Sequence, residues 1–104
     1  IELVGGESAQ GTGGAVLIAS GMGRALTSGD VVVRTEMSGP GGVSGDVVVQ
    51  SGTSCAGDSG SISLVTGQST QGAGGDIQLL VGRGDTGDGG AVLVAAGEST
   101  PASS

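Results

Sequence analysis

The stretch Ser54–Ser61, SCAGDSGS, contains the side chains in this sequence that most invite a chemical role, with the Ser59 hydroxyl next to the Asp58 carboxylate. A serine acts as a nucleophile when a neighbouring base takes its proton, and that base is normally a histidine oriented by a carboxylate. The chain has no histidine, and its three basic residues are all arginines, so no lysine replaces it. We therefore assign no catalytic residue and predict that the protein is not an enzyme.

The ten acidic residues could instead bind a hard cation such as calcium through carboxylate oxygens. Asp30, Asp46 and Asp76 share one position of a repeat described below, but other copies carry Ala15, Ser61 and Ala91 there. The remaining aspartates, Asp58, Asp85 and Asp88, are predicted in turns. Because the series of carboxylates is interrupted, we predict no metal site and no cofactor.

Charge and hydropathy exclude two further classes of partner. The formal net charge of −7 repels the phosphates of nucleic acids, so we predict no nucleic-acid partner. The longest apolar runs, AVLIA and AVLVAA, are much shorter than the roughly 18 residues of a membrane-spanning helix, and no membrane span is predicted. Cys55 is the single cysteine, so the chain forms no internal disulfide.

The sequence is a tandem repeat. Branched apolar residues open seven similar segments at positions 1, 16, 31, 47, 62, 77 and 92, with spacings of 15 residues and one of 16. We number the positions of each segment as columns. Column one is always Val or Ile and column three is Leu, Ile or Val, while column six is glycine in six of seven copies and column eleven in five. The alternation predicts a short strand, and the glycines predict recurrent turns.

The repeat also accounts for the residues around Ser59. GDSG resembles the segment around the nucleophile of trypsin-like serine proteases, but the resemblance covers only eight residues. Within the repeat, GDSG ends the fourth copy and corresponds to GTGG, GAGG and GDGG in other copies. Ser59 is therefore predicted in a turn.

A 15-residue unit with one short strand cannot bury its apolar side alone, whereas stacked units build a continuous ladder. We predict an all-β fold, a parallel β-solenoid (β-helix) of seven coils with about 15 residues per coil. Two copies per 30-residue coil fit the same pattern. The prediction is one array over residues 1–104, with coils starting at 1, 16, 31, 47, 62, 77 and 92, within a longer or end-to-end assembled chain. Columns one and three would form the core ladder: Ile1, Leu3, Val16, Ile18, Val31, Val33, Val47, Val49, Ile62, Leu64, Ile77, Leu79, Val92 and Val94.

Columns two and four would point outward, yet nine of these fourteen positions are apolar. A sheet that is apolar on both sides is normally covered on both sides. We therefore predict that the larger of these side chains form an assembly face that contacts other copies: Val4, Leu17, Val32, Val48, Val65, Leu80 and Leu93.

The motif Φ-x-Φ-x-x-G-x-S-x-x-G-x-G-G-(D/A), where Φ is a branched apolar residue, resembles the Gly/Ser-rich tandem-repeat β-solenoid arrays of long secreted, surface or filament proteins of microbes. The resemblance covers the whole chain and rests on repeat style. It implies a β-solenoid fold and a structural role. We predict an extracellular or cell-surface location.

The predicted function is structural: a rigid subunit of an extracellular filament or surface fibre that assembles with itself through the apolar outward strand faces and the coil ends. The alternative is a surface adhesin or carbohydrate-binding module, in which columns seven to ten, varied as ESAQ, MGRA, TSCA and RGDT, display contacts. Turn hydroxyls are candidate acceptors for glycans, namely Ser54, Ser69, Thr70, Ser99 and Thr100.

Overall fold

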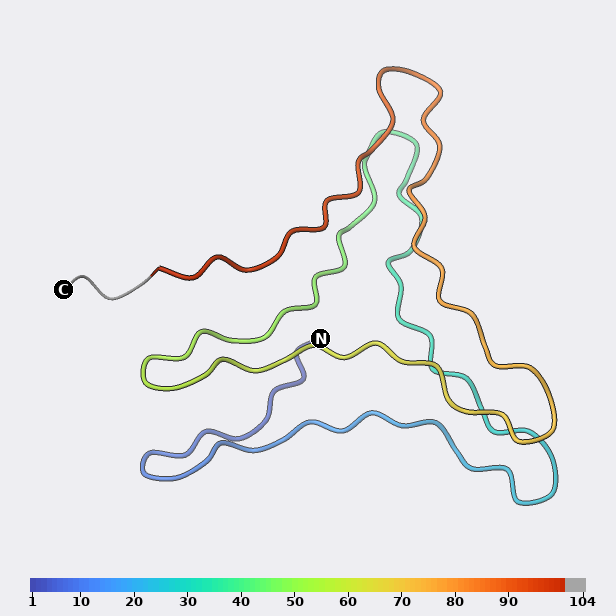
Figure 1. Cartoon of the computed structure of the whole chain (residues 1–104). Helices are drawn as coiled ribbons and strands as arrows, with labels where there is room; N and C mark the ends of the chain where they lie inside the picture. Colours follow the sequence, from blue (N-terminus) through green and yellow to red (C-terminus); the bar gives the residue numbers. More distant parts are fainter. Residues whose placement is uncertain (101–104) are drawn as a thin grey trace. The chain divides into compact units, whose positions relative to one another are not determined.

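A computed structural model describes residues 1–100, and this part of the chain contains no helix and no β-strand. Its backbone alternates between extended segments and bends (Figure 1). The chain divides into two compact units, Ile1–Gln50 and Ser51–Ser104. Each unit, taken by itself, contains three bends.

The bends recur with the period of the sequence repeat. They lie at residues 9–11, 24–26, 40–42, 55–57, 70–72 and 85–87. At two of them the column-eleven glycines, Gly57 and Gly87, have φ angles of 117° and 86°. Residues that have a Cβ rarely adopt such φ angles, so glycine is required at these two turns. The glycine column therefore coincides with the places where the backbone changes direction.

The predicted parallel β-solenoid is wrong, and the terms β-solenoid and β-helix do not describe residues 1–100. A solenoid would hydrogen-bond each extended segment to the next coil at a spacing of about 4.8 Å. In the described part, three backbone hydrogen bonds are present, and each lies within one repeat. The N–H groups of Gly14, Gly29 and Gly42 donate to the carbonyl oxygens of Gly6, Gly21 and Gly39, at 2.7, 3.1 and 3.2 Å.

The physical reason is that the glycine-rich half of each repeat folds back on itself. In the first two repeats the closing bond joins residues eight positions apart, so the half that should have completed a coil is used in a local loop. Only the short apolar stretch remains to connect one loop to the next. Since glycine offers no side chain for a second apolar layer, none of the residues 1–100 is buried.

The residues of the predicted core ladder are exposed to solvent. From the second repeat to the seventh, the column-one side chains are 53–60% exposed. Column three and the predicted assembly face have overlapping ranges, 65–85% and 70–89%. Exposure therefore does not separate an inner from an outer face, and that division stays a prediction.

Candidate functional site

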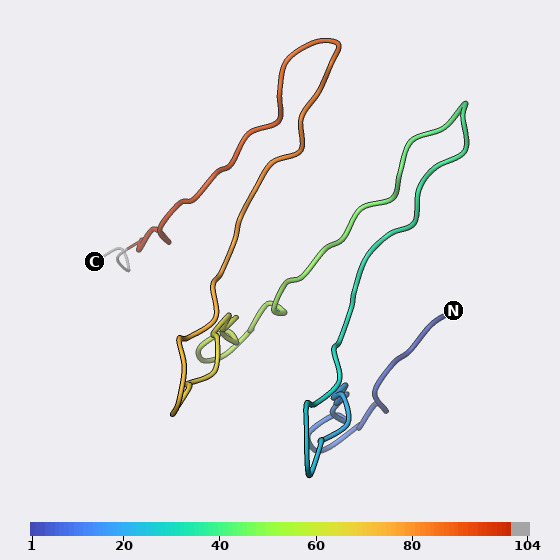
Figure 2. The same ribbon diagram turned by 90° about the vertical axis from the view of Figure 1, so that its right-hand side faces the viewer.

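Six loops, each closed at its base, are the repeated local structure of the chain (Figures 1 and 2). In every loop the residue in column five lies against a glycine on the returning limb. We call these two residues the loop base. The six bases pair Gly5 with Gly14, Ser20 with Gly29, Thr35 with Gly45, Ser51 with Gly60, Thr66 with Gly75, and Val81 with Gly90.

The glycine of the base allows the two limbs to approach closely. A Cβ placed on Gly14 would lie 2.8 Å from the Gly6 nitrogen, and one placed on Gly90 would lie 2.7 Å from Val81 Cγ1. Both distances are shorter than a normal van der Waals contact, so a side chain would push the limbs apart. Val81, at 45%, is the least exposed large hydrophobic residue in the described part.

Serine in column eight closes the tip of several loops. The Ser8 Oγ accepts a hydrogen bond of 3.0 Å from the Gly11 N–H. In the fifth loop, a Cβ on Gly72 would lie 3.2 Å from the Ser69 Oγ. Ser69 and Gly72, which occupy the columns of Ser8 and Gly11, are therefore also close together. A serine hydroxyl that bonds nearby backbone in this way stabilises a turn without any regular secondary structure.

Where column eight is glycine, the tip closes by backbone approach instead. A Cβ on Gly23 would collide with the carbonyl oxygen of Thr27, and one on Gly84 would lie 3.7 Å from that of Asp88. Within residues 1–100, just three residues are half-buried, Gly5, Gly23 and Ser38. All three belong to a loop base or a loop tip, so loop closure supplies what little burial the chain has.

The third loop is one residue longer than the others, and the extra residue lies at its tip. Gly39 and Gly42 bracket a β-turn with Pro40 at its second position, where the fixed φ of proline fits. The Ser38 Oγ donates to the Gly42 carbonyl oxygen at 3.2 Å. The base is still closed, here by a different bond, which Thr35 Oγ1 donates to the Gly45 carbonyl oxygen at 3.2 Å.

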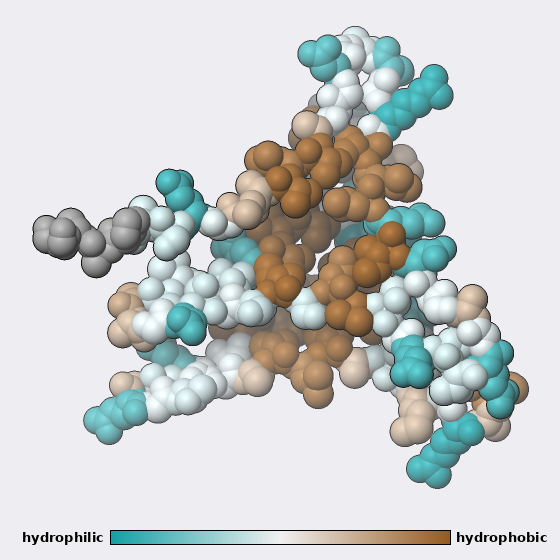
Figure 3. Space-filling view, in the orientation of Figure 1, coloured by the Kyte–Doolittle hydropathy of each residue, from teal (hydrophilic) through white to brown (hydrophobic). Residues whose placement is uncertain are grey.

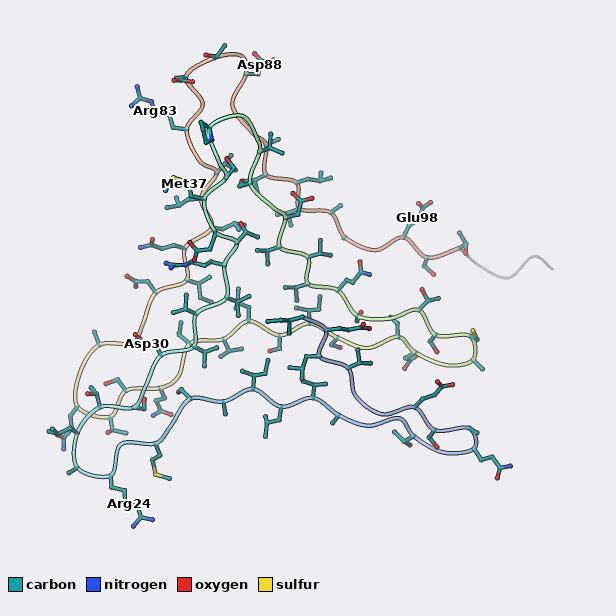
Figure 4. All side chains as sticks on the ribbon, turned by 180° about the vertical axis from the view of Figure 1, so that it is seen from behind. Arg24, Asp30, Met37, Arg83, Asp88 and Glu98 are labelled. Atoms are coloured by element: carbon teal, nitrogen blue, oxygen red, sulfur yellow. The ribbon has the colours of Figure 1, made fainter. Side chains whose placement is uncertain are left out.

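Charged side chains are exposed on and beside the loops. Figure 4 shows Arg24 and Arg83 pointing away from the chain. The Asp85 carboxylate accepts a hydrogen bond of 3.3 Å from Thr86 Oγ1. Arg34 and Glu36 form an ion pair of 3.1 Å with side chains that are 71% and 80% exposed, so it contributes at most about 1 kcal/mol.

The residues with candidate chemical roles do not converge. Ser59 is exposed on the returning limb of the fourth loop, and Cys55 is exposed at its bend. Asp30, Asp46 and Asp76 precede three different extended segments. Residues 1–100 enclose no pocket and bring together no group of three or more Cys, Asp or Glu side chains.

The candidate glycan acceptors are all accessible. The five hydroxyl residues, Ser54, Ser69, Thr70, Ser99 and Thr100, are exposed. As to membranes, no helix within the described range has the length and hydrophobicity needed to cross a bilayer.

The extended segments between loops carry the apolar side chains. Figure 3 shows hydrophobic residues gathered over these segments and hydrophilic ones toward the loops. Each of the seven residues predicted for the assembly face is exposed. The chain therefore presents two kinds of surface, polar loops and bare apolar segments.

The sequence reasoning missed the loop bases, although a signal for them was present. Every base has glycine on its returning limb, while the opposing column five varies among Gly, Ser, Thr and Val. An invariant glycine facing a small or β-branched residue indicates close approach of two backbones. A comparison with family models, curated proteins and solved structures found no match to this chain.

Proposed function

We propose that this chain is a structural protein that assembles with further copies of itself, as a subunit of an extracellular filament or surface fibre. The proposal rests on one observation, the area that a single copy leaves exposed. The chain exposes 10726 Å² to solvent. A folded monomer of its mass, 9.6 kDa, is expected to expose roughly 5,100 Å².

The excess, roughly 5,600 Å², is larger than one ordinary interface can cover, because each partner of a standard complex buries about 800 Å². Several copies around each chain are therefore needed to cover it. The repeat supports the same conclusion. Each protein molecule offers apolar segments at regular intervals along its chain, so it can contact more than one neighbouring molecule.

The proposed contacts differ from those predicted from the sequence in one respect. Without strands in residues 1–100, there are no outward strand faces and no coil ends to stack. The surfaces available for assembly are the extended segments themselves, whose backbone N–H and C=O groups lack partners within the described part. Unpaired extended backbone next to apolar side chains favours association.

The test is sedimentation velocity and electron microscopy of the purified chain over a range of concentrations. We expect the weight-average mass to rise with concentration and elongated particles to form. A chain that stays monomeric at the highest soluble concentration would contradict the proposal, because its apolar segments would then be stable in water.

The second candidate function is a binding module, which the loops favour. Six loops have a column-five residue against a glycine at the base, while their exposed tips differ in sequence, and variable tips on a similar base are typical of recognition surfaces. Binding to an array of glycans or to intact cells tests this candidate. Replacing the tip residues Arg83 and Asp85 with alanine should reduce binding, whereas the same change in Glu2 and Glu98 should not.

A further inference from the structure

The six-residue sequence SGDVVV occurs twice in the chain, at residues 28–33 before the third loop and at residues 44–49 where that loop ends. Gly29–Val33 and Gly45–Val49 both read GDVVV. The valines of the two GDVVV segments also have similar solvent exposure. Val31, Val32 and Val33 are 53, 72 and 75% exposed, and Val47, Val48 and Val49 are 56, 74 and 74% exposed.

The third loop sets the direction of the two segments. Its base joins Thr35 to Gly45, so the first GDVVV segment leads into the loop and the second one leads out of it (Figures 1 and 2). In residues 1–100, no backbone hydrogen bond involves either run of three valines. Each copy of the protein therefore offers two identical runs of three valines, Val31–Val33 and Val47–Val49, without backbone hydrogen bonds in the described part.

The composition of these segments determines which partner fits them. Each segment contains three consecutive β-branched residues, Val31–Val33 or Val47–Val49, and such residues favour extended pairing and dry packing between identical segments. The other apolar stretches are less suited to this, since ISLV and IQLL include polar Ser63 and Gln78, and VLIA and VLVAA contain alanine. A second copy of the protein supplies the same pair of segments beside the same loop, so identical segments can pair with each other.

We propose that the valine runs of the two GDVVV segments, Val31–Val33 and Val47–Val49, are where two copies of the protein first associate, each run bonding along its backbone to the same run of the second copy. This inference rests on the proposed self-assembly and specifies where it begins. Because the two valine runs flank one loop, each encounter can form two contacts, and the second contact is intramolecular in effect.

The experiment compares two double variants that add the same charge to different segments. Val32→Asp with Val48→Asp alters both GDVVV segments, and Leu80→Asp with Leu93→Asp alters two later segments of similar or greater exposure. Assembly is followed by light scattering at equal protein concentration. Since the chain has no buried residue within 1–100, neither variant removes a packed core.

We expect the valine variant to lengthen the lag before assembly by more than about tenfold, because a desolvated carboxylate costs several kcal/mol at an apolar contact. The leucine variant should change the lag by less than about threefold relative to the parent chain. A third variant, Val32→Ile with Val48→Ile, should assemble like the parent chain.

Equal delays in the two aspartate variants, or a longer delay in the leucine variant, would overturn the inference and leave the proposed function intact. Failure of the parent chain itself to assemble at any concentration would overturn both. The two failures are thus distinguished by the behaviour of the parent chain.

Discussion

At the scale of single residues, order in this chain comes from small side chains that permit or complete a close approach. Gly14 and Gly90 allow the limbs of a loop to meet, and Ser8 bonds to the backbone across a loop tip. None of these contacts is buried. Each therefore has a modest energy, and its effect is local.

Adding a methyl group at a loop base should open that loop. In Gly90→Ala the new Cβ would lie 2.7 Å from Val81 Cγ1, so we expect the contact between residues 81 and 90 to be lost, at a cost of about 1 kcal/mol. The nuclear Overhauser effect from the Val81 methyl groups to residue 90 measures this contact. The control is Gly89→Ala, which meets no atom within 4 Å and should leave the signal unchanged. If the signal persists in Gly90→Ala, the two limbs accommodate the methyl group without separating, and the prediction is wrong.

Removing the tip hydroxyl should release one amide. Ser8→Ala deletes the acceptor of the Gly11 N–H, and a net hydrogen bond of about 1 kcal/mol corresponds to roughly a fivefold faster amide exchange at Gly11. Ser8→Thr retains a hydroxyl and should restore the parent rate. If Gly11 exchanges equally fast in the parent and in Ser8→Ala, the bond is not populated in solution.

At the scale of the elements, each repeat consists of an extended segment and the loop that follows it. The sequence predicted where the chain turns, because glycines such as Gly57 and Gly87 allow positive φ angles that other residues avoid. The sequence did not predict whether the segments between the turns pair with other strands. The apolar period of two in columns one and three, as in Val47 and Val49, is compatible both with a strand in a ladder and with an isolated extended segment, since the period describes the segment and not its partner.

The loop bases escaped prediction for a related reason. A contact such as Thr35 with Gly45 joins residues ten apart, and column-by-column comparison of repeats does not reveal which columns meet. The candidate catalytic and metal residues were easier to assess. Asp30, Asp46 and Asp76 recur at one repeat length or its multiples, and such spacing separates side chains unless the copies are stacked against one another.

Deleting Gly39 tests whether loop and segment are independent. The third repeat then has the common length of 15 residues, and we expect Ser38 Oγ to accept a hydrogen bond from the Gly42 N–H, as Ser8 does from Gly11. Chemical-shift changes should be confined to residues between Thr35 and Gly45. Deleting Val32 is the matched control, because it reverses the side-chain alternation of its segment and should perturb shifts there. Changes that spread from the Gly39 deletion into Val47–Val49 would contradict the separation.

At the scale of the whole molecule, one copy lacks the features that make a protein unfold cooperatively. No residue of the described part is buried, and no regular secondary structure is present there. Dilute monomer should therefore show a circular dichroism spectrum without a β-sheet minimum, and its ellipticity should change gradually on heating. A sharp thermal transition in monomer confirmed by sedimentation would contradict this description.

Charge should oppose association between copies. Each chain carries −7, and Asp30 and Asp46 precede the two GDVVV valine runs directly. Raising the ionic strength from about 10 mM to about 150 mM shortens the Debye length from roughly 30 Å to roughly 8 Å, so assembly should become faster. Light scattering at both salt concentrations measures the effect. In Asp30→Asn with Asp46→Asn the salt dependence should be weaker, and an unchanged dependence would place the relevant repulsion elsewhere.

The extra residue of the third loop has a consequence for how such a chain can be altered. Gly39 lengthens the tip while Thr35 and Gly45 still meet, so one such insertion is absorbed before it reaches the flanking valines. Foreign peptides grafted between Pro40 and Gly41 would be held by the same base. The repeat is in this sense a cassette, in which tip sequences can be exchanged or extended one at a time while the loop base stays closed.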